Sequence, residues 1–473
     1  MIKAFMLMRR KKIVIAIGLA SIFVILLVPK TLFTNNSIVS NFFEDSQAYC
    51  NKAADVTGDE GRNLQGYELL QVQVIIRHGD RAPIELDALP NTSPVHISCL
   101  FHKHAETNYG TLMQRFEKVM SKSPFLVVNS KNTELVQQSI YCKGGQLTPH
   151  GYLQHLFLGK YLKFRYKDFL DNLTVDRDIL VKSTDVARTI QSAAALLSEL
   201  FYDYKKDHSI IIYVYNDQVA DGHMLLDENN QNLACHKLPE IMSFFEKKSN
   251  TWKEFVNKLF PILKNIANVL HLEKKDLPPI NRIVDILYTR LCHNKGIPRG
   301  PGEKLSSKVV KDAFKVAHEY TIVKHGAVAE YQSLSILSQM AKHAFDIIVG
   351  KASKKFVLFS GHDSMITPFL MLLEIYDGKW PPYASRVVVE FYLKNNNTAS
   401  VKQKIENTFF RVIYNGVIAK KISFCKSSDF ETLCSLLALF DYVSNGSFNI
   451  NGDLSRKNVH KLLFTRIKYI CEL

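Results

Sequence analysis

Short runs of β-branched and aromatic residues recur along this chain and alternate with longer helical patterns. The runs that predict strands span residues 69–76, 179–182, 209–215, 356–359, 386–393 and 409–414. Helical periodicity covers residues 150–170, 188–202, 250–272 and 309–349. Such alternation predicts an α/β fold with a mixed, mostly parallel central sheet flanked by helices. The last two strand runs are expected to pair as a hairpin.

The interval from about 219 to 350 has few strand signals and many helix-forming residues. We interpret it as a mainly helical insertion, or cap, that lies over the sheet. The composition, 47% apolar and 22% charged, is that of a globular protein with a sizeable core. The folded domain is therefore expected over residues 68–473, with the cap inserted into it.

An uncharged apolar segment, Ile13–Pro29, precedes this domain. As a helix it would be about 25 Å long, which is close to the thickness of a thin bilayer. Four basic residues, Arg9–Lys12, lie directly before it, so the positive-inside rule places residues 1–12 in the cytosol and the rest in the lumen. A cleaved signal peptide is the alternative, although no small-residue cleavage site follows. We predict an uncleaved type II transmembrane signal-anchor and a polar lumenal stem over residues 30–67.

All eight cysteines follow this apolar segment, and none of them forms a C-x-x-C pair. Disulfide bonds in an oxidising lumen are therefore expected. Spacing does not determine their connectivity, but the short loop favours Cys425–Cys434, and Cys99–Cys142 comes next. Five N-x-S/T sequons are glycosylation candidates: Asn35, Asn91, Asn172, Asn396 and Asn445.

The first predicted strand is followed directly by charged residues: residues 74–83 read VIIRHGDRAP. Ligands of α/β sheets bind at the carboxyl ends of strands. Gly79 permits a tight turn and a close approach of the backbone to a ligand. Arg77 and Arg81 supply two planar guanidinium groups beside the imidazole of His78, and this set suits a tetrahedral oxyanion such as phosphate. We hypothesise that residues 77–83 form a phosphate-binding loop.

Two later strands also end in polar segments. The STDVAR segment (183–188) opens a helix, and it would place Arg188 in the first turn, near the same crevice. An ordinary capped helix with a solvent-facing arginine is the alternative interpretation. The SGHD segment (360–363) follows the strand at 356–359. His362 is able to donate to a phosphate oxygen, and Asp363 is able to protonate a leaving oxygen.

In combination, RHGDRAP, STDVARTIQSA and GHD resemble the histidine acid phosphatase branch of the histidine phosphatase superfamily. The likeness runs from about residue 68 to the C-terminus and includes the L-T-x-x-G helix of that family, within residues 145–166. The type II anchor, the LCHN sequence (291–294) and the RVIYNGV sequence (411–417) followed by Cys425 are similar to the Golgi 2-phosphoxylose phosphatases of this family. Lys182 and Gly361 depart from the commoner family pattern without removing a catalytic group.

The resemblance implies a mechanism in which His78 attacks phosphorus and forms a phosphohistidine. Asp363 would act as the proton donor to the leaving oxygen and then activate the hydrolytic water. The phosphate oxygens would be held by Arg77, Arg81, Arg188 and His362. No cofactor or metal is implied, and the group His96, His102 and His104 lacks an evident carboxylate partner for a metal site.

The resemblance further implies a lumenal Golgi enzyme that removes the 2-phosphate from xylose in the glycosaminoglycan–protein linkage region. Sixty basic against 45 acidic residues favour an anionic partner, such as a phosphorylated sugar. We expect no nucleic-acid partner, since no motif of that kind is present. A broad-specificity lysosomal or cell-surface acid phosphatase is one alternative, and a catalytically silent glycan-binding membrane protein is another. The sequence does not indicate an oligomeric state.

Overall fold

The computed structural model describes residues 48–86, 89–101, 110–201, 209–215, 235, 237–350, 354–394, 400–425 and 432–472. The predicted membrane segment Ile13–Pro29 lies outside this part of the chain, as do Asn35, Asn396, His102 and His104. No helix within the described ranges has both the length and the apolar character needed to cross a membrane.

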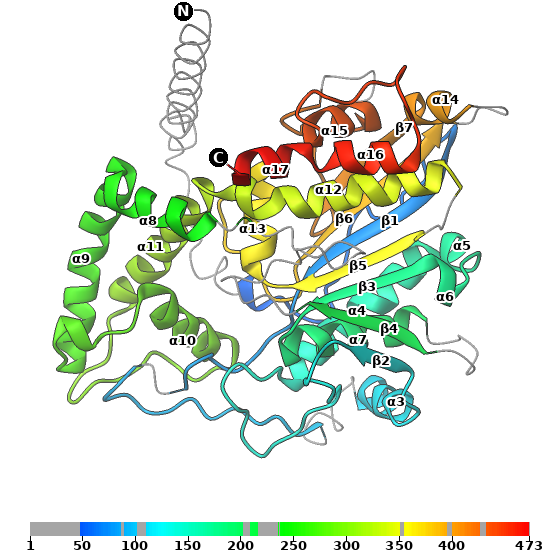
Figure 1. The fold of residues 1–473 in the computed structure, drawn as a ribbon. Coiled ribbons are helices and arrows are strands. Elements are labelled where there is room, and N and C mark those ends of the chain that lie inside the picture. The colour runs from blue at the N-terminus through cyan, green and yellow to red at the C-terminus, as the bar shows by residue number, and fades with distance from the viewer. Residues whose placement is uncertain are drawn as a thin grey trace, which may run out of the picture. The chain divides into compact units, whose positions relative to one another are not determined.

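Nine strands form one mixed sheet in the order β2-β4-β3-β5-β1-β6-β7-β8, with β9 paired to β7 (Figure 1). The strands are β1 (Tyr67–Arg77), β2 (Phe125–Val128), β3 (Ile179–Thr184), β4 (Ile210–Tyr215), β5 (Phe356–Gly361), β6 (Arg386–Lys394), β7 (Thr408–Tyr414), β8 (Val417–Ile418) and β9 (Cys434–Ser435). The five strands from β2 to β1 are parallel, as expected. The expectation of a mostly parallel sheet is wrong for the other half, where every ladder from β1–β6 onward is antiparallel. That half includes the predicted hairpin, β6–β7.

Strand β1 lies at the junction of the two halves and is buried from Gln71 to its end. It pairs in parallel with β5, and the register places Arg77 opposite Gly361. Strand β3 pairs with the other side of β5, with Ser183 opposite Ser360. The three polar segments predicted from the sequence therefore leave the sheet at neighbouring strand ends.

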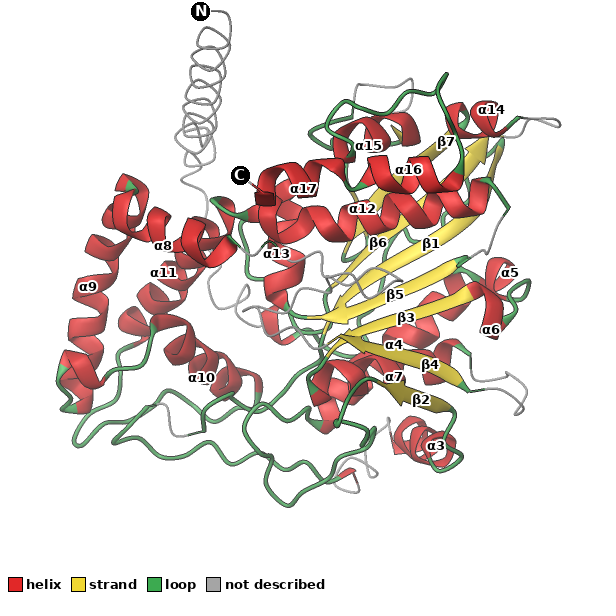
Figure 2. Cartoon of the chain, in the orientation of Figure 1, coloured by secondary structure: helices red, strands yellow, loops and turns green. Residues whose placement is uncertain are grey.

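Helices cover both faces of the sheet (Figure 2). The helices of the N-terminal half are α3 (Gly110–Met120), α4 (Pro149–Arg165), α5 (Lys167–Leu170), α6 (Val175–Asp178) and α7 (Ala187–Leu200). Those of the C-terminal half are α12 (Ala329–Ile348), α13 (Asp363–Leu372), α14 (Val401–Glu406), α15 (Leu436–Val443), α16 (Arg456–Leu463) and α17 (Thr465–Glu472). Helices α4 and α7 share a hydrophobic cluster with one face of the sheet, and α12 to α17 share one with the other face.

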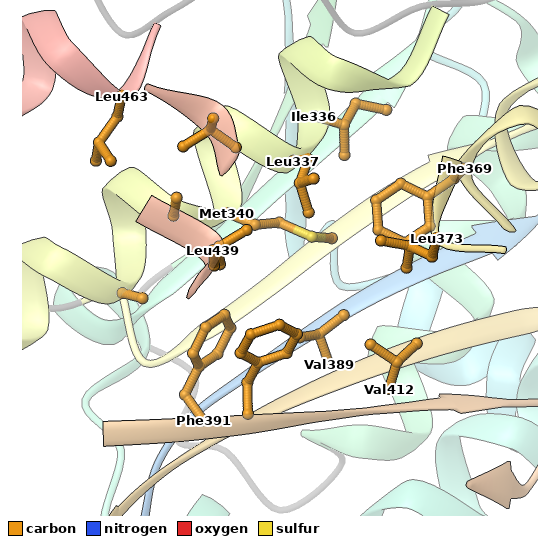
Figure 3. Close-up of a cluster of buried hydrophobic side chains, with 14 of the residues drawn as sticks. Ile336, Leu337, Met340, Phe369, Leu373, Val389, Phe391, Val412, Leu439 and Leu463 are labelled. Atoms are coloured by element: carbon orange, nitrogen blue, oxygen red, sulfur yellow. The ribbon is translucent and has the colours of Figure 1, made fainter. Parts of the chain in front are cut away.

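The larger hydrophobic cluster lies between α12, α13 and the antiparallel strands (Figure 3). Met340 of α12 and Phe369 of α13 pack there with Val389 and Phe391 of β6. Val388, directly before Val389 on β6, belongs to the cluster on the opposite face, as the alternation of side chains along a strand requires. Each side chain of this size contributes roughly 1.5–3 kcal/mol when it is fully buried.

The cap consists of α8 (Leu238–Lys248), α9 (Asn250–Leu270), the 3₁₀ turn η3 (Lys274–Asp276), α10 (Ile280–Cys292) and α11 (Ser307–Gly326). The helical pattern over 309–349 divides at residues 327–328 into α11 and α12. Helix α12 is buried along most of its length because it packs on the sheet, so it belongs to the core layer and not to the cap. The cap is thus helical as expected, but it ends at Gly326 and not near 350.

The chain that precedes β1 is also part of the domain. Cys50 forms a disulfide bond with Cys292 at the end of α10. Glu60 is buried and pairs with Arg386 of β6 at 2.6 Å. These contacts contradict the prediction of a stem that extends to residue 67, because residues 48–66 are fixed to the sheet and the cap. The polar composition of this segment reflects buried ion pairs and turns, which composition alone does not distinguish from a linker.

Four disulfide bonds connect all eight cysteines: Cys50–Cys292, Cys99–Cys142, Cys235–Cys471 and Cys425–Cys434. Two of these pairs are the ones that the sequence favoured. The other two join residues more than 230 positions apart. Three predicted glycosylation sites, Asn91, Asn172 and Asn445, lie at the surface. Among them, Asn91 already donates from its side chain to the backbone oxygen of Leu270 at 2.8 Å.

Candidate active site

A cavity of about 350 Å³ lies at the carboxyl ends of β1, β3 and β5, beneath α10 and α11 of the cap. Five of the six predicted site residues line it: His78, Arg81, Arg188, His362 and Asp363. The sixth, Arg77, is fully buried behind them, with its Nε 4.0 Å from an Oδ1 of Asp363. The structure therefore brings all six side chains together.

His78 is held as a neutral ring. Its Nδ1 lies 2.8 Å from the backbone oxygen of Gly79. Since a carbonyl oxygen only accepts, Nδ1 carries the proton and the lone pair lies on Nε2. Burial, together with the positive charges of Arg188 and Arg77, lowers the pKa of His78 well below its usual value. An imidazole in this state has a free nucleophilic nitrogen at neutral pH.

The described residues do not use every donor of the three arginines. Arg81 binds Asp285 of α10 through both terminal nitrogens, at 3.0 and 2.8 Å. The Nε atoms of Arg77, Arg81 and Arg188 have no hydrogen-bond partner among the described residues. Burial and the nearby charge of Arg81 lower the pKa of Arg188 to about 9. Crowded cations with unused donors favour the entry of a phosphate-like oxyanion.

Arg77 is positioned by residues that sequence reasoning missed. One of its terminal nitrogens donates to the hydroxyl of Tyr49 at 2.8 Å and another to the backbone oxygen of Pro381. Its guanidinium also lies over the rings of Tyr49 and Tyr383, 5.0 and 4.5 Å from their centroids. Tyr49 lies 28 residues before Arg77, and no pattern in the sequence marks it.

His362 and Asp363 join β5 to α13. The Nε2 of His362 is 3.1 Å from the hydroxyl of Thr184, and burial and Arg188 lower the pKa of this histidine to about 3. Burial alone would raise the pKa of Asp363, but the charge of Arg77 and a hydrogen bond from the indole of Trp380 together lower it. Asp363 is therefore ionised in this arrangement.

The L-T-x-x-G segment supports the phosphate loop from behind. Thr148 caps α4 by accepting from the backbone N–H of Gly151, and its hydroxyl donates to the carboxylate of Asp80. The same carboxylate faces Nε2 of His293 at 2.9 Å. Asp80 thus has a structural role that its position in the motif did not reveal.

Asp285 carries no sequence signal, since it is one polar residue on the amphipathic helix α10. His293, directly after that helix, lies in the LCHN sequence, which the resemblance marked without giving this residue a role. In the described part of the chain, no three His, Cys, Asp or Glu side chains are placed to hold a metal ion. His96, which was considered as a metal ligand, packs near the ring of Tyr141.

Fold and site define a class of protein, an α/β enzyme with a histidine and an arginine cluster at the strand ends. Comparison with known families identifies the family within this class. The family model of the histidine phosphatase superfamily (branch 2) matches residues 68–276 and 314–415, so the chain belongs to that family. It is a phosphoric monoester hydrolase of the histidine acid phosphatase type. Helix α10 lies between the two matched ranges.

Two curated relatives cover most of the chain. 2-Phosphoxylose phosphatase 1 of Xenopus tropicalis is 27% identical over 445 residues, which is 89% of this chain and 83% of the relative. Prostatic acid phosphatase of Rattus norvegicus is 26% identical over 342 residues, 70% of this chain and 77% of the relative. Multiple inositol polyphosphate phosphatase of Bifidobacterium longum, solved with phosphate, has the same fold, with a TM-score of 0.52 and 12% identity over 84% of this chain and 97% of that one.

Proposed function

We propose that this enzyme transfers the phosphoryl group of its substrate to Nε2 of His78. The lone pair on this nitrogen attacks phosphorus in line with the ester oxygen. The P–O bond breaks as the N–P bond forms, and its electron pair moves to the leaving oxygen. Arg77, Arg81 and Arg188 balance the charge on the three remaining oxygens.

Asp363 completes the reaction in this proposal. The incoming phosphate compensates the neighbouring guanidinium charges that keep Asp363 ionised, so its pKa rises in the complex. The carboxylic acid then protonates the leaving oxygen and becomes a carboxylate again. In the second half, this carboxylate accepts a proton from the water that attacks phosphorus, and the N–P bond returns its electron pair to His78.

The observation that carries the proposal is the pairing of a neutral His78 with three arginines whose Nε atoms are unpartnered. A structural ion-pair network would use those donors within the protein. The test is a single-turnover experiment with the purified full chain and a ³²P-labelled monoester. Acid-labile label should be trapped on the wild-type protein and be absent from the His78→Ala variant. Equal turnover by both proteins would refute the assignment of the nucleophile.

For the substrate, we propose the 2-phosphate of xylose in the glycosaminoglycan–protein linkage region. This proposal is supported by the likeness to 2-phosphoxylose phosphatase 1 of Xenopus tropicalis, which extends over 89% of this chain. The basic balance of the chain suits such an anionic glycan. The purified enzyme should release phosphate from a linkage oligosaccharide that contains 2-phosphoxylose with a higher kcat/KM than from p-nitrophenyl phosphate.

A broad-specificity acid phosphatase is the second candidate, and the match to rat prostatic acid phosphatase favours it. The two candidates differ in the ratio of kcat/KM values across a panel of sugar phosphates, nucleotides and the linkage oligosaccharide. Similar kcat/KM values for all these substrates would favour the second candidate over the first.

We also propose that residues 13–29 anchor the enzyme in the Golgi membrane, with residues 1–12 in the cytosol and the catalytic domain in the lumen. The apolar run, the basic residues before it and the sequons after it support this topology. In sealed microsomes, the domain should resist added protease until detergent is present. Digestion without detergent would rule out this orientation.

A further inference from the structure

Trp380 contacts the group that we propose as proton donor. It lies in the loop between α13 and β6 and lines the cavity with Asp363. Its indole N–H donates to Oδ2 of Asp363. The other carboxylate oxygen, Oδ1, faces Arg77 and lies 4.0 Å from the Nε of that residue. The two oxygens of one carboxylate therefore have different partners.

An indole nitrogen donates one hydrogen bond and accepts none. Accepting this hydrogen bond occupies one lone pair of Oδ2 and withdraws electron density from it, so protonation is less favourable on Oδ2 than on Oδ1. The Nε of Arg77, which is the cationic neighbour of Oδ1, makes no hydrogen bond to a described residue. A proton on Asp363 consequently belongs on Oδ1.

The Trp380 ring is itself held by aromatic side chains from distant segments. It meets the rings of Tyr49 and Tyr288 edge to face, with centroids 6.3 and 6.2 Å away. These two tyrosines stack on each other at 3.8 Å. The next residue, Pro381, accepts a hydrogen bond from Arg77 through its backbone oxygen. One short segment thus orients both the proton donor and a phosphate-binding arginine.

We propose that Trp380 is a positioning residue that holds Asp363 by Oδ2 so that Oδ1 delivers the proton to the leaving oxygen. This inference rests on the proposed function, because it assumes that Asp363 is the donor. During phosphoryl transfer, the P–O bond breaks, the leaving oxygen takes the proton from Oδ1, and the neutral alcohol departs. The indole hydrogen bond also stabilises the carboxylate that remains.

The test compares a poor leaving group with a good one. The Trp380→Phe variant keeps an aromatic ring but lacks the N–H donor. The kcat for glycerol 2-phosphate, whose alkoxide needs a proton, should fall about tenfold or more. The kcat for p-nitrophenyl phosphate, whose phenolate leaves without one, should change by less than about threefold. Loss of the donor should also move the alkaline limb of the kcat–pH profile to higher pH, since the carboxylate has lost a hydrogen bond.

Matched controls are present in the chain. Trp252 on α9 is its other tryptophan and packs against Phe245 and Phe255 in the cap, so Trp252→Phe should alter neither kcat nor the pH profile. Trp380→His retains a ring N–H and should recover part of the lost rate. It also serves as the second test if Trp380→Phe unfolds at a lower temperature. Equal losses on both substrates with an unchanged pH profile in Trp380→Phe would overturn the inference.

The Asp363→Asn variant distinguishes failure of the role of Trp380 from failure of the proposed proton-donor function of Asp363. A large loss on glycerol 2-phosphate in Asp363→Asn, together with no selective loss in Trp380→Phe, would reject the role of Trp380 and leave the donor assignment intact. Full activity of Asp363→Asn on glycerol 2-phosphate would reject the donor itself.

Discussion

Gly79 of the phosphate loop and Gly151 of α4 lie backbone against backbone. A Cβ on Gly79 would come within 2.7 Å of the Cα of Gly151, and a Cβ on Gly151 would lie 2.9 Å from the backbone nitrogen of Asp80. The sequence suggested that Gly79 allows a tight turn and a close approach to a ligand. The structure shows a different cause, because Gly79 does not have a positive φ and its close neighbour is the helix.

We therefore expect Gly151→Ala to displace the loop that carries His78. The added methyl group meets backbone atoms that have no room to move, and overpacking of this kind costs about 1–3 kcal/mol. Stability to urea and kcat should both fall. A matched control is Gly326→Ala at the end of α11, where no atom lies within 4 Å of the added Cβ and φ is not positive. Wild-type kcat in Gly151→Ala would contradict this account of the loop.

The pairing of Arg81 with Asp285 predicts how phosphate affinity depends on the cap. Both side chains are nearly inaccessible, at 6% and 8% exposure, so the carboxylate is the main charge that orients this guanidinium. Asp285→Asn removes that charge and should weaken inhibition by inorganic phosphate about tenfold or more. Asp276→Asn, an exposed change in the same cap, should leave the inhibition constant unaltered. An unchanged constant in Asp285→Asn would mean that Arg81 is positioned by other contacts.

The contact between His293 and Asp80 predicts a pH-dependent contribution to stability. Burial by itself would lower the pKa of His293, but the charge of Asp80 and the hydrogen bond to it have the larger effect. The pKa of His293 is therefore raised above its usual 6.5. A raised pKa in the folded state means that the contribution is fully present below pH 6.5 and is lost as the pH rises through the higher folded value. The difference in the free energy of unfolding between wild type and His293→Gln should therefore be largest at about pH 6 and smallest at alkaline pH. Chemical unfolding at several pH values measures this difference.

At low pH, the stability contributed by this pair is lost when the carboxylate of Asp80 becomes protonated. Burial would raise the pKa of Asp80, but His293 lowers it overall below 3.8, so the pair stays charged until the pH falls under that value. His96→Gln, at an exposed position, provides the matched control. A difference between wild type and His293→Gln that stays constant from pH 5 to pH 9 would be inconsistent with a charged pair.

The disulfide bond Cys50–Cys292 ties the segment of Tyr49 to the end of α10. In the chain-entropy model, a loop of this length stabilises the fold by about 5 kcal/mol, against about 3 kcal/mol for the short Cys425–Cys434 loop. The Cys50→Ser/Cys292→Ser variant should lose more stability than Cys425→Ser/Cys434→Ser. It should also lose kcat, because Tyr49 holds Arg77. Thermal unfolding and steady-state kinetics of the two variants test this, and identical losses in both would argue against it.

Several features of the fold could be predicted from local patterns. The β-branched runs at 69–76 and 356–359 became β1 and β5, with ends within two residues of the prediction. The hairpin of β6 and β7 was also predicted correctly. Strand β2 and the two-residue strands β8 and β9 were missed, because such short segments carry too little periodicity to be distinguished from loops.

Residue chemistry at the strand ends, together with the family resemblance, indicated the candidate site from the sequence alone. Arginine, histidine and aspartate that directly follow buried strands are costly to place there unless they face a ligand, so His78 and Asp363 stood out by type and position. Only the tertiary structure revealed the partners that orient them: Tyr49, Asp285 and Trp380. The contact between Asp285 and Arg81 spans 204 residues of sequence, and it depends on how a separate cap helix packs over the sheet. Local sequence encodes which groups are reactive, whereas packing between distant segments decides how those groups are held.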